Sequence, residues 1–453
     1  MVERSEAVEE QAVRDGSAVY AVEAEITTTE DVPPGYKRTE VGVIPEDWSV
    51  VKLGCAMANI IDFRGRTPKK LGMNWGGGDI PALSARNVKM GKIDFREETY
   101  YGSEKLYKRW MTNGHVEKGD VVVTMEAPLG NVALIPDHQR YILSQRTILL
   151  QPDSSSLLSE FLAQLLPSPW FQKVLQDNGT GSTATGIQRR RFERLDIPCP
   201  PITEQRAIAT ALSDADALIE SLDRLIAKKR AIKQAAMQQL LTGQTRLPGF
   251  TGEWETKRLG NVASFHKGSG LSKADLLADG SKSCIHYGEL FTQYGERITS
   301  VKSLTDSEAA CFKSIENDVL MPTSDVTPNG LATASCIAES NVILGGDILV
   351  IRPTRAEIDG TFLAYKIRMD HRQIMQLVSG TTVFHIYGRD MAEFTYKAPT
   401  TEEQQAIVSV LSDLDTDIDA LERRRNKACQ IKQAMMQQLL TGRVRLVTPE
   451  VAA

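Results

Sequence analysis

The sequence contains little that would place the chain in a membrane or outside the cell. Its six cysteines are scattered without a CxxC pair, which argues for reduced thiols rather than a disulfide framework. No run of about 18 apolar residues occurs, and no signal-peptide pattern opens the chain, so we expect neither a membrane span nor secretion. The expected location is the cytoplasm.

Motifs that carry chemistry are also absent. The sequence has no GxxxxGK[ST] nucleotide loop, no HExxH, no zinc-type Cys or His pairs, and no Gly-rich turn for a dinucleotide or methyl donor. It lacks the Asn/Asp-Pro-Pro-aromatic motif of amino-methyltransferases and a nuclease carboxylate cluster with its lysine. Cys284 and His286 stand two apart, without an evident further ligand. We therefore expect no metal site and no catalytic residue.

The overall composition is that of an ordinary globular protein, with 42% hydrophobic and 25% charged residues over a length of 453. The segment Met1–Asp31 carries nine acidic and two basic residues and predicts a poorly packed leader. Because the whole chain carries −5 and this segment −7, the remainder carries +2. The acidic total does not exclude a polyanionic partner, since a local basic surface decides that binding.

One stretch of the sequence occurs twice. Glu204–Leu247 and Glu403–Leu446, 199 positions apart, are identical at about 25 of 44 positions and both end in QQLLTG followed by an Arg-Leu pair. Each copy is preceded by about 150 residues or more, enough for one domain. The order along the chain is therefore domain, repeat, domain, repeat.

Each copy carries apolar residues at alternating spacings of four and three, the heptad pattern of a coiled-coil helix. The predicted seam consists of Ile208, Leu212, Ile219, Leu222, Ile226 and Leu240 in the first copy and Ile407, Leu411, Leu414, Ile418, Leu421 and Leu439 in the second. The basic residues Lys229, Lys233, Arg425 and Lys432 also fall on seam positions. We expect loose packing there and a register set by these cations.

Helix start and stop signals frame both copies. A proline lies upstream of each, Thr400 and Glu403 have capping-box spacing, and Gly243 and Gly442 follow the last leucines. A helix of about 38 residues would be about 57 Å long and could not bury its apolar stripe alone. The two copies are therefore expected to pair antiparallel, with the two domains at opposite ends and related by a pseudo-twofold axis.

The fold class that we predict is α+β: two mixed, strand-rich domains joined by two long helices that form an antiparallel coiled coil in a pseudo-twofold, circular arrangement. The expected boundaries are an acidic segment 1–34, a first domain 35–200, a first spacer helix 201–247, a second domain 248–398, a second spacer helix 399–446 and a tail 447–453. β-Rich runs are Gly119–Met125, Tyr141–Pro152, Asn317–Thr323 and Asn341–Pro353, and short helices are Leu157–Leu166 and Thr361–Met369.

The two domains share a frame but differ in their loops. Trp48 aligns with Trp254 in the opening segments, where tryptophan is typically a core anchor. Late in each domain lies a small-residue loop, Gly179–Phe192 in the first and Ser379–Met391 in the second, and the two loops differ in sequence. A constant frame with different loops is typical of two recognition domains that bind different targets.

The chain resembles the specificity subunit of type I restriction-modification systems. The resemblance is carried by the paired PxxxEQ-helix-QQLLTG segments, the GxIPEDWxxxxLG opening, the runs Arg64–Val88 and Gly268–Gly295, and the GTT loop before the second helix, and it covers about Gly35 to Leu446. It implies two target recognition domains that each bind one half of an asymmetric, bipartite DNA sequence. It also implies spacer helices that set the gap and dock two methyltransferase subunits, which restriction subunits can join.

The partners and cofactors follow from this resemblance. Double-stranded DNA and two methyltransferase subunits are the expected partners, with restriction subunits as a further possibility and no membrane. S-adenosylmethionine, ATP and Mg are expected on the partner subunits and none on this chain. One heptad adds about 10.5 Å of helix, close to three base pairs, so helix length can translate into the number of unread bases.

Candidate DNA-binding residues in the first domain lie in a basic run with interleaved aromatics. Forked guanidinium and amide donors suit base edges, and lysines suit phosphates. We therefore expect base contacts from Arg64, Arg66, Arg86 and Asn87, and phosphate contacts from Lys69 and Lys70. The loop that ends the domain adds Arg189, Arg190 and Arg191. The alternative for each is an ordinary solvated charged surface.

In the second domain the candidates occupy corresponding or family-like positions. They are Lys267, Ser272, Lys273, His286, Tyr287, Thr381, Thr382, His385 and Arg389. Two other functions remain open at this stage. A coiled-coil adaptor that organises partner proteins would show no sequence-dependent DNA binding, and a nuclease with an unrecognised site would show metal-dependent cleavage by the isolated chain.

Overall fold

The computed structural model describes residues 32–181, 185–307 and 311–447, so the acidic segment Met1–Asp31 lies outside the described residues. The chain forms two compact units. Unit 1 contains the residues up to Leu218 and those from Ala428 onward, and unit 2 is Ile219–Lys427. The division falls within the two long helices, so each unit combines one strand-rich domain with the start of one helix and the end of the other.

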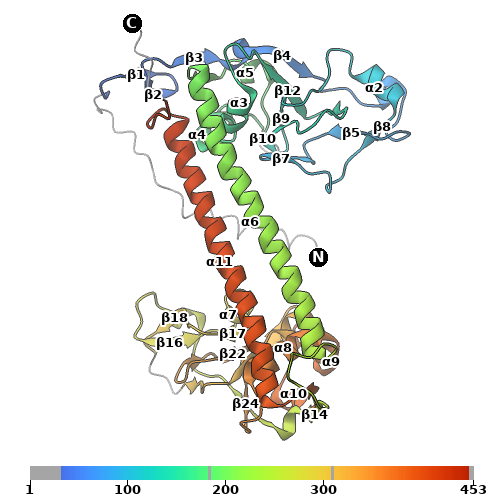
Figure 1. Cartoon of the computed structure of the whole chain (residues 1–453), viewed down its shortest axis with the longest axis vertical. Coiled ribbons are helices and arrows are strands. Elements are labelled where there is room, and N and C mark those ends of the chain that lie inside the picture. Colours follow the sequence, from blue (N-terminus) through green and yellow to red (C-terminus); the bar gives the residue numbers. More distant parts are fainter. Residues whose placement is uncertain (1–31, 182–184, 308–310, 448–453) are drawn as a thin grey trace. The chain divides into compact units, whose positions relative to one another are not determined.

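The long helices are α6 (Ile202–Thr242, 41 residues) and α11 (Thr401–Leu439, 39 residues). In unit 1 the start of α6 and the end of α11 share one apolar core, and in unit 2 the end of α6 shares a core with the start of α11. These residues are Ile208, Leu212, Met436 and Leu439 in unit 1, and Leu240, Leu241, Ile407 and Leu411 in unit 2. The helices therefore pair antiparallel within each unit (Figure 1).

Most residues of the predicted seam are buried, and Ile219, Leu414 and Leu421 are half-buried. Each basic seam residue binds an aspartate of the other helix. The pairs are Lys229 with Asp417 (2.6 Å), Lys233 with Asp415 (2.6 Å), Arg425 with Asp223 (3.1 Å) and Lys432 with Asp216 (2.6 Å). Because a shift along the helix would separate all of these charges, they specify the register of the pair.

A buried carboxylate joins three segments of unit 1. Glu204, in the first turn of α6, is fully buried and accepts hydrogen bonds from Arg445 (2.5 and 2.6 Å) and from the indole N–H of Trp48 (2.8 Å). Arg445 also binds Asp47 (2.7 and 2.9 Å). Burial opposes the charged guanidinium, but the hydrogen bonds to Asp47 and Glu204 raise the pKa of Arg445 above its ordinary value, so this arginine stays charged.

Unit 2 contains the same junction with other residues. Glu403 of α11 is buried and binds Arg246 at 2.5 Å, and the Arg246 guanidinium lies 5.7 Å from the ring centroid of Trp254. Glu403 has capping-box spacing from Thr400, and in the structure both oxygens of its carboxylate bind Arg246. Its carboxylate is used by the arginine that follows the other helix.

The glutamine after each of these glutamates ties the helix start to its domain. Gln205 donates to the carbonyls of Ser156 and Pro200 (both 2.8 Å) and accepts from the amide of Leu158 (2.8 Å). Gln404 makes the corresponding bonds to Glu357, Pro399 and Asp359 (3.0, 2.9 and 3.1 Å). The paired EQ motif is thus a structural joint, which explains its occurrence in both copies.

The domain of unit 1 is built on a four-stranded antiparallel sheet in the order β10-β9-β12-β4, beside a smaller sheet β11-β5-β8 and the pairs β1-β2, β6-β7 and β13-β3. Its strands are β1 (Tyr36–Thr39), β2 (Gly42–Pro45), β3 (Ser49–Lys52), β4 (Met57–Asp62), β5 (Ile80–Leu83), β6 (Val88–Lys89), β7 (Lys92–Ile93), β8 (Tyr101–Gly102), β9 (Val121–Met125), β10 (Leu129–Leu134), β11 (Ile142–Leu143), β12 (Thr147–Pro152) and β13 (Asp196–Cys199). Its helices are η1 (Leu53–Ala56), η2 (Lys69–Leu71), α2 (Glu104–Trp110), α3 (Ser159–Leu165), α4 (Pro169–Asp177) and α5 (Arg189–Phe192).

The domain of unit 2 repeats this plan with the sheets β15-β24-β20-β22-β17 and β18-β16-β23-β19 and the pairs β14-β26 and β21-β25. Its strands are β14 (Glu255–Arg258), β15 (Ala263–Lys267), β16 (Lys282–Ile285), β17 (Arg297–Ile298), β18 (Ser303–Thr305), β19 (Phe312–Lys313), β20 (Val319–Pro322), β21 (Ser324–Asp325), β22 (Ser335–Ile337), β23 (Ile343–Leu344), β24 (Ile348–Pro353), β25 (Phe384–His385) and β26 (Thr395–Ala398). Its helices are η3 (Leu259–Asn261), η4 (Lys273–Asp275), α7 (Glu289–Thr292), η5 (Pro328–Ala332), α8 (Gly360–Met369), α9 (His371–Leu377) and α10 (Gly388–Met391).

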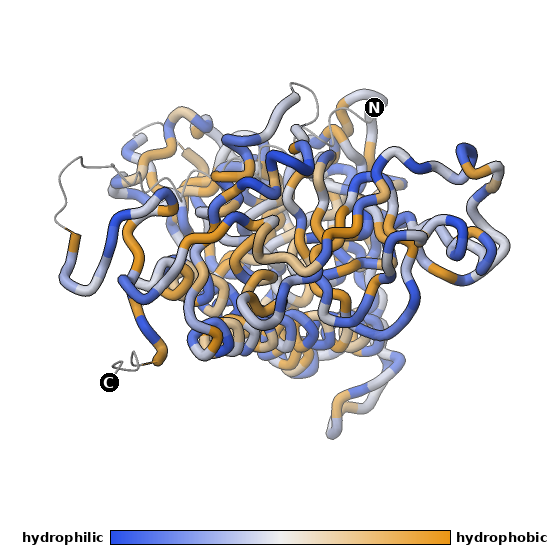
Figure 2. Tube along the Cα trace, turned by 90° about the horizontal axis from the view of Figure 1, so that it is seen from above, coloured by the Kyte–Doolittle hydropathy of each residue, from blue (hydrophilic) through white to orange (hydrophobic). Residues whose placement is uncertain are grey.

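The predicted β-rich runs contain β9, β12, β20 and β24, and the two predicted short helices are α3 and α8. The central strands are buried on both faces because α3 and α8 and the smaller sheets cover them. Figure 2 shows hydrophobic residues mainly along the inner segments and hydrophilic residues mainly along the outer loops. Among the described residues, no helix is long and apolar enough to cross a membrane.

Replacement of Arg445 by alanine should destabilise unit 1, because Glu204 would keep a buried charge without its cation. We expect a loss of about 3 to 5 kcal/mol, measured as a lower urea midpoint of unfolding followed by tryptophan fluorescence. Arg443→Ala, at an exposed position two residues earlier, is the matched control. Equal midpoints for the two variants would contradict this role of Arg445.

Candidate nucleic-acid interface

One edge of the large sheet of unit 1 gathers loops that are far apart in the sequence. It contains the ends of β4 and β9 and the starts of β10 and β12. The small-residue loop joins this edge, because Gly186 pairs with Glu126 and Thr180, and the amide of Ile187 donates to the carbonyl of Met125 (3.0 Å). Residues 182–184 of that loop lie outside the described residues.

Arg64 lies at this edge with its guanidinium held by the protein. It binds both carboxylate oxygens of Asp62 (2.8 to 3.1 Å) and the carbonyl of Ile187 (3.4 Å), and its side chain is 26% exposed. Burial opposes the charge of Asp62, but the bonds from Arg64 hold the pKa of this carboxyl below its ordinary value, with a smaller effect of Arg189. Arg64 and Arg189, 125 positions apart, are thus brought to the same carboxylate.

The neighbouring candidates divide into bound and exposed side chains. Arg66 donates to the carbonyl of Trp110 and to the hydroxyl of Thr112 (3.1 Å) and covers the ring of Phe63. The ammonium of Lys70 donates to the carbonyl of Gly65 (2.7 Å). These contacts shape the loop after β4 and leave less of each cation for DNA.

Lys69 is exposed and lines a cavity of about 340 Å³ with Trp75 and Tyr100. The two aromatic rings are stacked, with centroids 5.6 Å apart, and Tyr100 is 42% exposed. A cation beside an exposed tyrosine that stacks on a half-buried tryptophan suits contact with nucleic acid.

Of the three arginines of α5, Arg190 and Arg191 are exposed and Arg189 is half-buried. Arg189 forms an ion pair with Glu193 at 2.5 Å, and Arg191 donates to the side-chain oxygen of Asn178 (3.2 Å). Arg190, between them, is exposed. It is the member of the triplet best placed for a phosphate.

The predicted base contact of Asn87 is wrong. Its side chain is fully buried, accepts from the amide of Ser84 (2.8 Å), and donates to the carbonyl of Ala82 (2.8 Å) and to the hydroxyl of Thr99 (3.3 Å). With both amide groups bonded internally, it supports the turn after β5 and does not reach a base. Arg86 is exposed and forms an ion pair with Glu98.

Unit 2 has an equivalent sheet edge, formed by the ends of β15 and β20 and the starts of β22 and β24. His385 pairs with Ser324 and with Ser379, as Gly186 pairs with Glu126 and Thr180 in unit 1. Lys267 lies at this edge, 64% exposed and 3.7 Å from Asp347. The same backbone construction therefore carries different side chains in the two units.

Three side chains stack on one another: His385 of β25, Tyr387 of the following loop and Arg389 of α10. The rings of His385 and Tyr387 are nearly parallel, with centroids 6.1 Å apart, and the guanidinium of Arg389 lies 5.4 Å from the Tyr387 centroid. Tyr387 is 44% exposed. Our sequence analysis did not include Tyr387, although its spacing of two from both His385 and Arg389 was visible. Thr381 and Thr382 are exposed in the preceding turn.

The remaining candidates of unit 2 have structural contacts of their own. Ser272 caps η4 through Asp275 (2.7 Å), which leaves the adjacent Lys273 exposed. His286 accepts the amide of Gly288 at its Nδ1 (3.3 Å), and its ring lies 4.6 Å from that of Tyr287. Both aromatic residues are half-buried.

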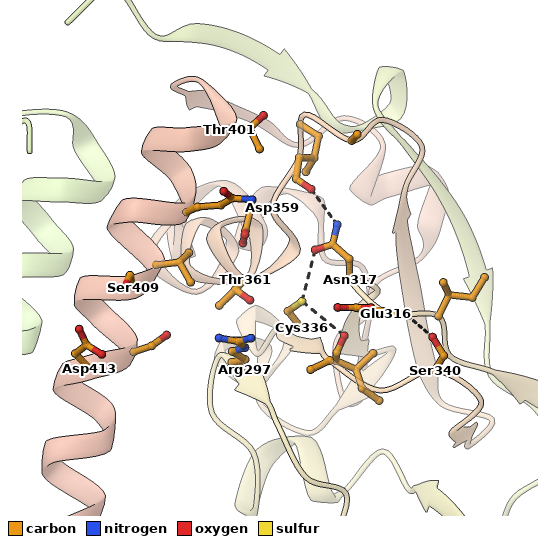
Figure 3. Close-up of a pocket in the computed structure, with 18 residues that line it drawn as sticks. Arg297, Glu316, Asn317, Cys336, Ser340, Asp359, Thr361, Thr401, Ser409 and Asp413 are labelled. Carbon is orange, nitrogen blue, oxygen red and sulfur yellow. Dashed lines mark hydrogen bonds between the residues drawn. The ribbon is translucent and has the colours of Figure 1, made fainter. Parts of the chain in front are cut away.

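Sequence reasoning also missed a groove that occurs once in each unit. In unit 2, α11 and the domain enclose about 790 Å³, and Figure 3 shows Thr401, Ser409 and Asp413 of the helix on one side of it and Asn317 and Cys336 of the domain on the other. In unit 1, a groove of about 380 Å³ lies beside the start of α6. The five helix residues of the smaller groove, Arg206, Ala209, Thr210, Ser213 and Asp214, correspond at the repeat offset to Gln405, Val408, Ser409, Ser412 and Asp413 of the larger one.

The thiol in the larger groove is not activated. Burial raises the pKa of the Cys336 thiol to about 12, so it is neutral and a poor nucleophile near pH 7. Within the described parts of the chain, no cluster of three or more His, Cys, Asp or Glu side chains is arranged to hold a metal ion. On the helix side, both grooves are lined mainly by small or polar residues, which suits contact with the surface of another protein.

Comparison with known proteins covers both units. The family model for the type I restriction modification DNA specificity domain matches residues 45–228 and again residues 251–430. The two matches are the two halves of the internal repeat, each consisting of one strand-rich domain and most of the long helix that follows it.

Individual relatives are similar over nearly their whole length. The putative type I restriction enzyme MjaX specificity subunit of Methanocaldococcus jannaschii is 23% identical over 91% of this chain and 97% of its own. The StySPI specificity subunit of Salmonella potsdam is 22% identical over 88% of this chain and 89% of its own. The crystal structure of a type I restriction-modification S subunit from M. genitalium superposes with a TM-score of 0.57 at 16% identity, covering 86% of this chain and 96% of that chain, a likeness of fold.

Proposed function

Because the chain belongs to the type I restriction modification DNA specificity family, we propose that it is the subunit that chooses the DNA sequence for a type I restriction-modification complex. It binds an asymmetric target in two parts, one part for each unit. The observation that carries this proposal is the repetition of one backbone frame with two differently equipped sheet edges. A duplicated frame supplies two similar docking geometries, and different side chains supply two different sequence preferences.

In unit 1 the proposed DNA-binding surface contains Arg64, Lys69, Arg190 and the Trp75–Tyr100 pair. In unit 2 it contains Lys267, Lys273, Arg389, Tyr387 and the turn at Thr381–Thr382. Cations hold the phosphates and fix the position of the duplex, and the groups between them meet the base edges. Asp62 orients Arg64 so that its remaining exposed surface is preset before DNA binds.

The antiparallel helices set the gap between the two half-sites. Ion pairs within both units specify the register of the two helices, so the helices cannot slide along one another. The gap then depends on the number of helical residues between the domains. A helix rises about 1.5 Å per residue and the duplex about 3.4 Å per base pair, which relates the two lengths.

The two equivalent grooves are the proposed docking positions for two methyltransferase subunits. Equivalent surfaces in the two units suit two copies of one partner. S-adenosylmethionine would then bind to those partners, and ATP and Mg to restriction subunits where these join. The chain itself performs no chemistry in this proposal, which is supported by the neutral thiol of Cys336 in the larger groove and by the sequence's lack of nucleotide and metal motifs.

The proposal as a whole is tested in cells by sequencing methylated bases with and without this gene beside its methyltransferase. We expect a single bipartite, asymmetric motif that depends on the gene. Methylation of the same motif without the gene would overturn the proposal. Metal-dependent DNA cleavage by the purified chain would support the nuclease alternative in its place.

Arg190→Ala should weaken binding of the assembled complex to its target by about three- to tenfold at moderate salt, and should reduce the slope of log K against log salt by about one. The physical reason is the loss of one phosphate contact. Arg355→Ala, at an exposed position in a loop of unit 2, is the control. Equal slopes for the two variants, measured by fluorescence anisotropy, would exclude Arg190 from the interface.

Insertion of seven residues after Ile226 of α6, together with seven after Leu421 of α11, should lengthen the gap in the methylated motif by about three base pairs, since one heptad adds about 10.5 Å. Both half-site sequences should stay the same. Methylome sequencing measures the result. An unchanged gap in a folded, active variant would contradict the role of the helices.

Thr210→Arg or the equivalent Ser409→Arg should each block one groove, because a long charged side chain would fill it. Each single variant should lose one methyltransferase copy from the complex, and the double variant should lose both. Native mass spectrometry measures the stoichiometry. Gln238→Arg, an equal change at an exposed position of α6, is the control. Retention of two copies by the double variant would exclude the grooves as docking positions.

A further inference from the structure

Two exposed valines, Val326 and Val383, lie at the edge of the large sheet of unit 2 and are called the apolar tip. Val326 is 70% exposed, more than any other large hydrophobic residue that the structure describes, and Val383 is 42% exposed. The strands β21 and β25 pair antiparallel with Asp325 opposite Phe384, and Val326 directly follows β21 while Val383 directly precedes β25. The same end of the two-stranded ribbon is therefore continued by two solvent-exposed valines.

The loop that presents Val326 is rigidly braced. The carboxylate of Asp325 accepts the amide of Val326 (2.6 Å) and the hydroxyl of Thr327 (2.9 Å). The amide of Gly330 returns to the carbonyl of Thr327 (3.2 Å), and a Cβ at position 330 would overlap the Asp325 carboxylate. The Asp325 carboxylate thus occupies the space beside Gly330, and hydrogen bonds hold the backbone on both sides of Val326.

The neighbouring position of the frame differs between the two units. Glu126, which pairs with Gly186 and forms an ion pair with Arg146 at 3.1 Å, corresponds to Ser324, which pairs with His385. Unit 1 therefore carries a charged residue where unit 2 carries a serine, two positions before Val326.

The two exposed valines add nothing to the core, and they offer a small apolar surface beside two exposed cations. A two-stranded ribbon has the width that the major groove of B-DNA admits, and the thymine C5-methyl is the apolar group that this groove presents. Lys267 and Arg389, 64% and 80% exposed, flank the same edge and can attract the backbone. Valine is too short for the wedges that unstack bases from the minor groove.

We infer that the β21–β25 ribbon enters the major groove and that Val326, with Val383 beside it, recognises the C5-methyl group of thymine in the half-site read by unit 2. The inference rests on the proposed function and makes it more specific. It assigns unit 2 a half-site that contains at least one A·T pair read through its methyl group. It also adds two residues that carry no hydrogen-bonding side chain to the set that determines specificity.

The test uses the chain assembled with its methyltransferase and duplexes of the target that methylome sequencing identifies. Each thymine is replaced in turn by deoxyuridine, which removes the C5-methyl and nothing else. We expect deoxyuridine at one or two positions of a single half-site to weaken wild-type binding by about three- to tenfold. Val326→Ala should weaken binding to the thymine duplex by a similar factor and show no further loss with deoxyuridine at that position.

Three further variants complete the experiment. Val326→Thr keeps one methyl group and should bind with intermediate affinity, and Val383→Ala should couple to the same or the adjacent thymine. Val444→Ala, a change at another exposed valine (47% exposed) in unit 1, should bind as wild type. If one half-site of the target contains no thymine in either strand, unit 2 must read the other half-site.

Independent, additive losses from deoxyuridine and Val326→Ala would overturn the inference, as would unchanged binding of Val326→Ala. Both results leave the proposed function intact, because the wild-type complex would still prefer its target to a scrambled duplex. Equal binding of the wild-type complex to target and scrambled duplexes would overturn the proposed function and this inference together.

Discussion

The structure depends on a buried carboxylate at the first turn of each long helix. Glu204 and Glu403 are withdrawn from water and each is neutralised by an arginine that follows the end of the other helix. A buried charge without its partner is strongly unfavourable, so each ion pair forces one helix end to lie beside the start of the other. The tryptophan of the domain opening packs on the same arginine, and the domain is thereby fixed to both helices.

This joint explains why a recognition surface can change without loss of the fold. The glutamate, the following glutamine and the arginine belong to the repeated segments, and their partners on the domain are mostly backbone carbonyls and amides. Loop residues at the sheet edge take no part in it. Side chains such as Glu126 and its counterpart Ser324 are therefore free to differ between the units, which is the condition for two unlike half-sites.

Residues predicted to meet DNA illustrate the limits of sequence reasoning. Arginine and asparagine were chosen because their side chains can read bases, but the same donors also satisfy buried loops. Asn87 is used inside a turn, and Arg64 and Arg66 are largely engaged by neighbouring protein groups. Val326 and Tyr387 were missed because exposure and register determine their role. Neither property is visible in an isolated valine or tyrosine of the sequence.

The sequence by itself determined the antiparallel long helices, the two strand-rich domains and their duplication, because heptad spacing, β-rich runs and a repeat offset are local or periodic patterns. The charged seam positions were also readable, since their phase follows from the heptad. Only the tertiary structure decided that Glu403 binds Arg246, that grooves lie beside both helix starts, and that distant loops share one sheet edge. These features depend on contacts between segments far apart in the chain, and no local pattern encodes which of several possible partners a side chain will meet.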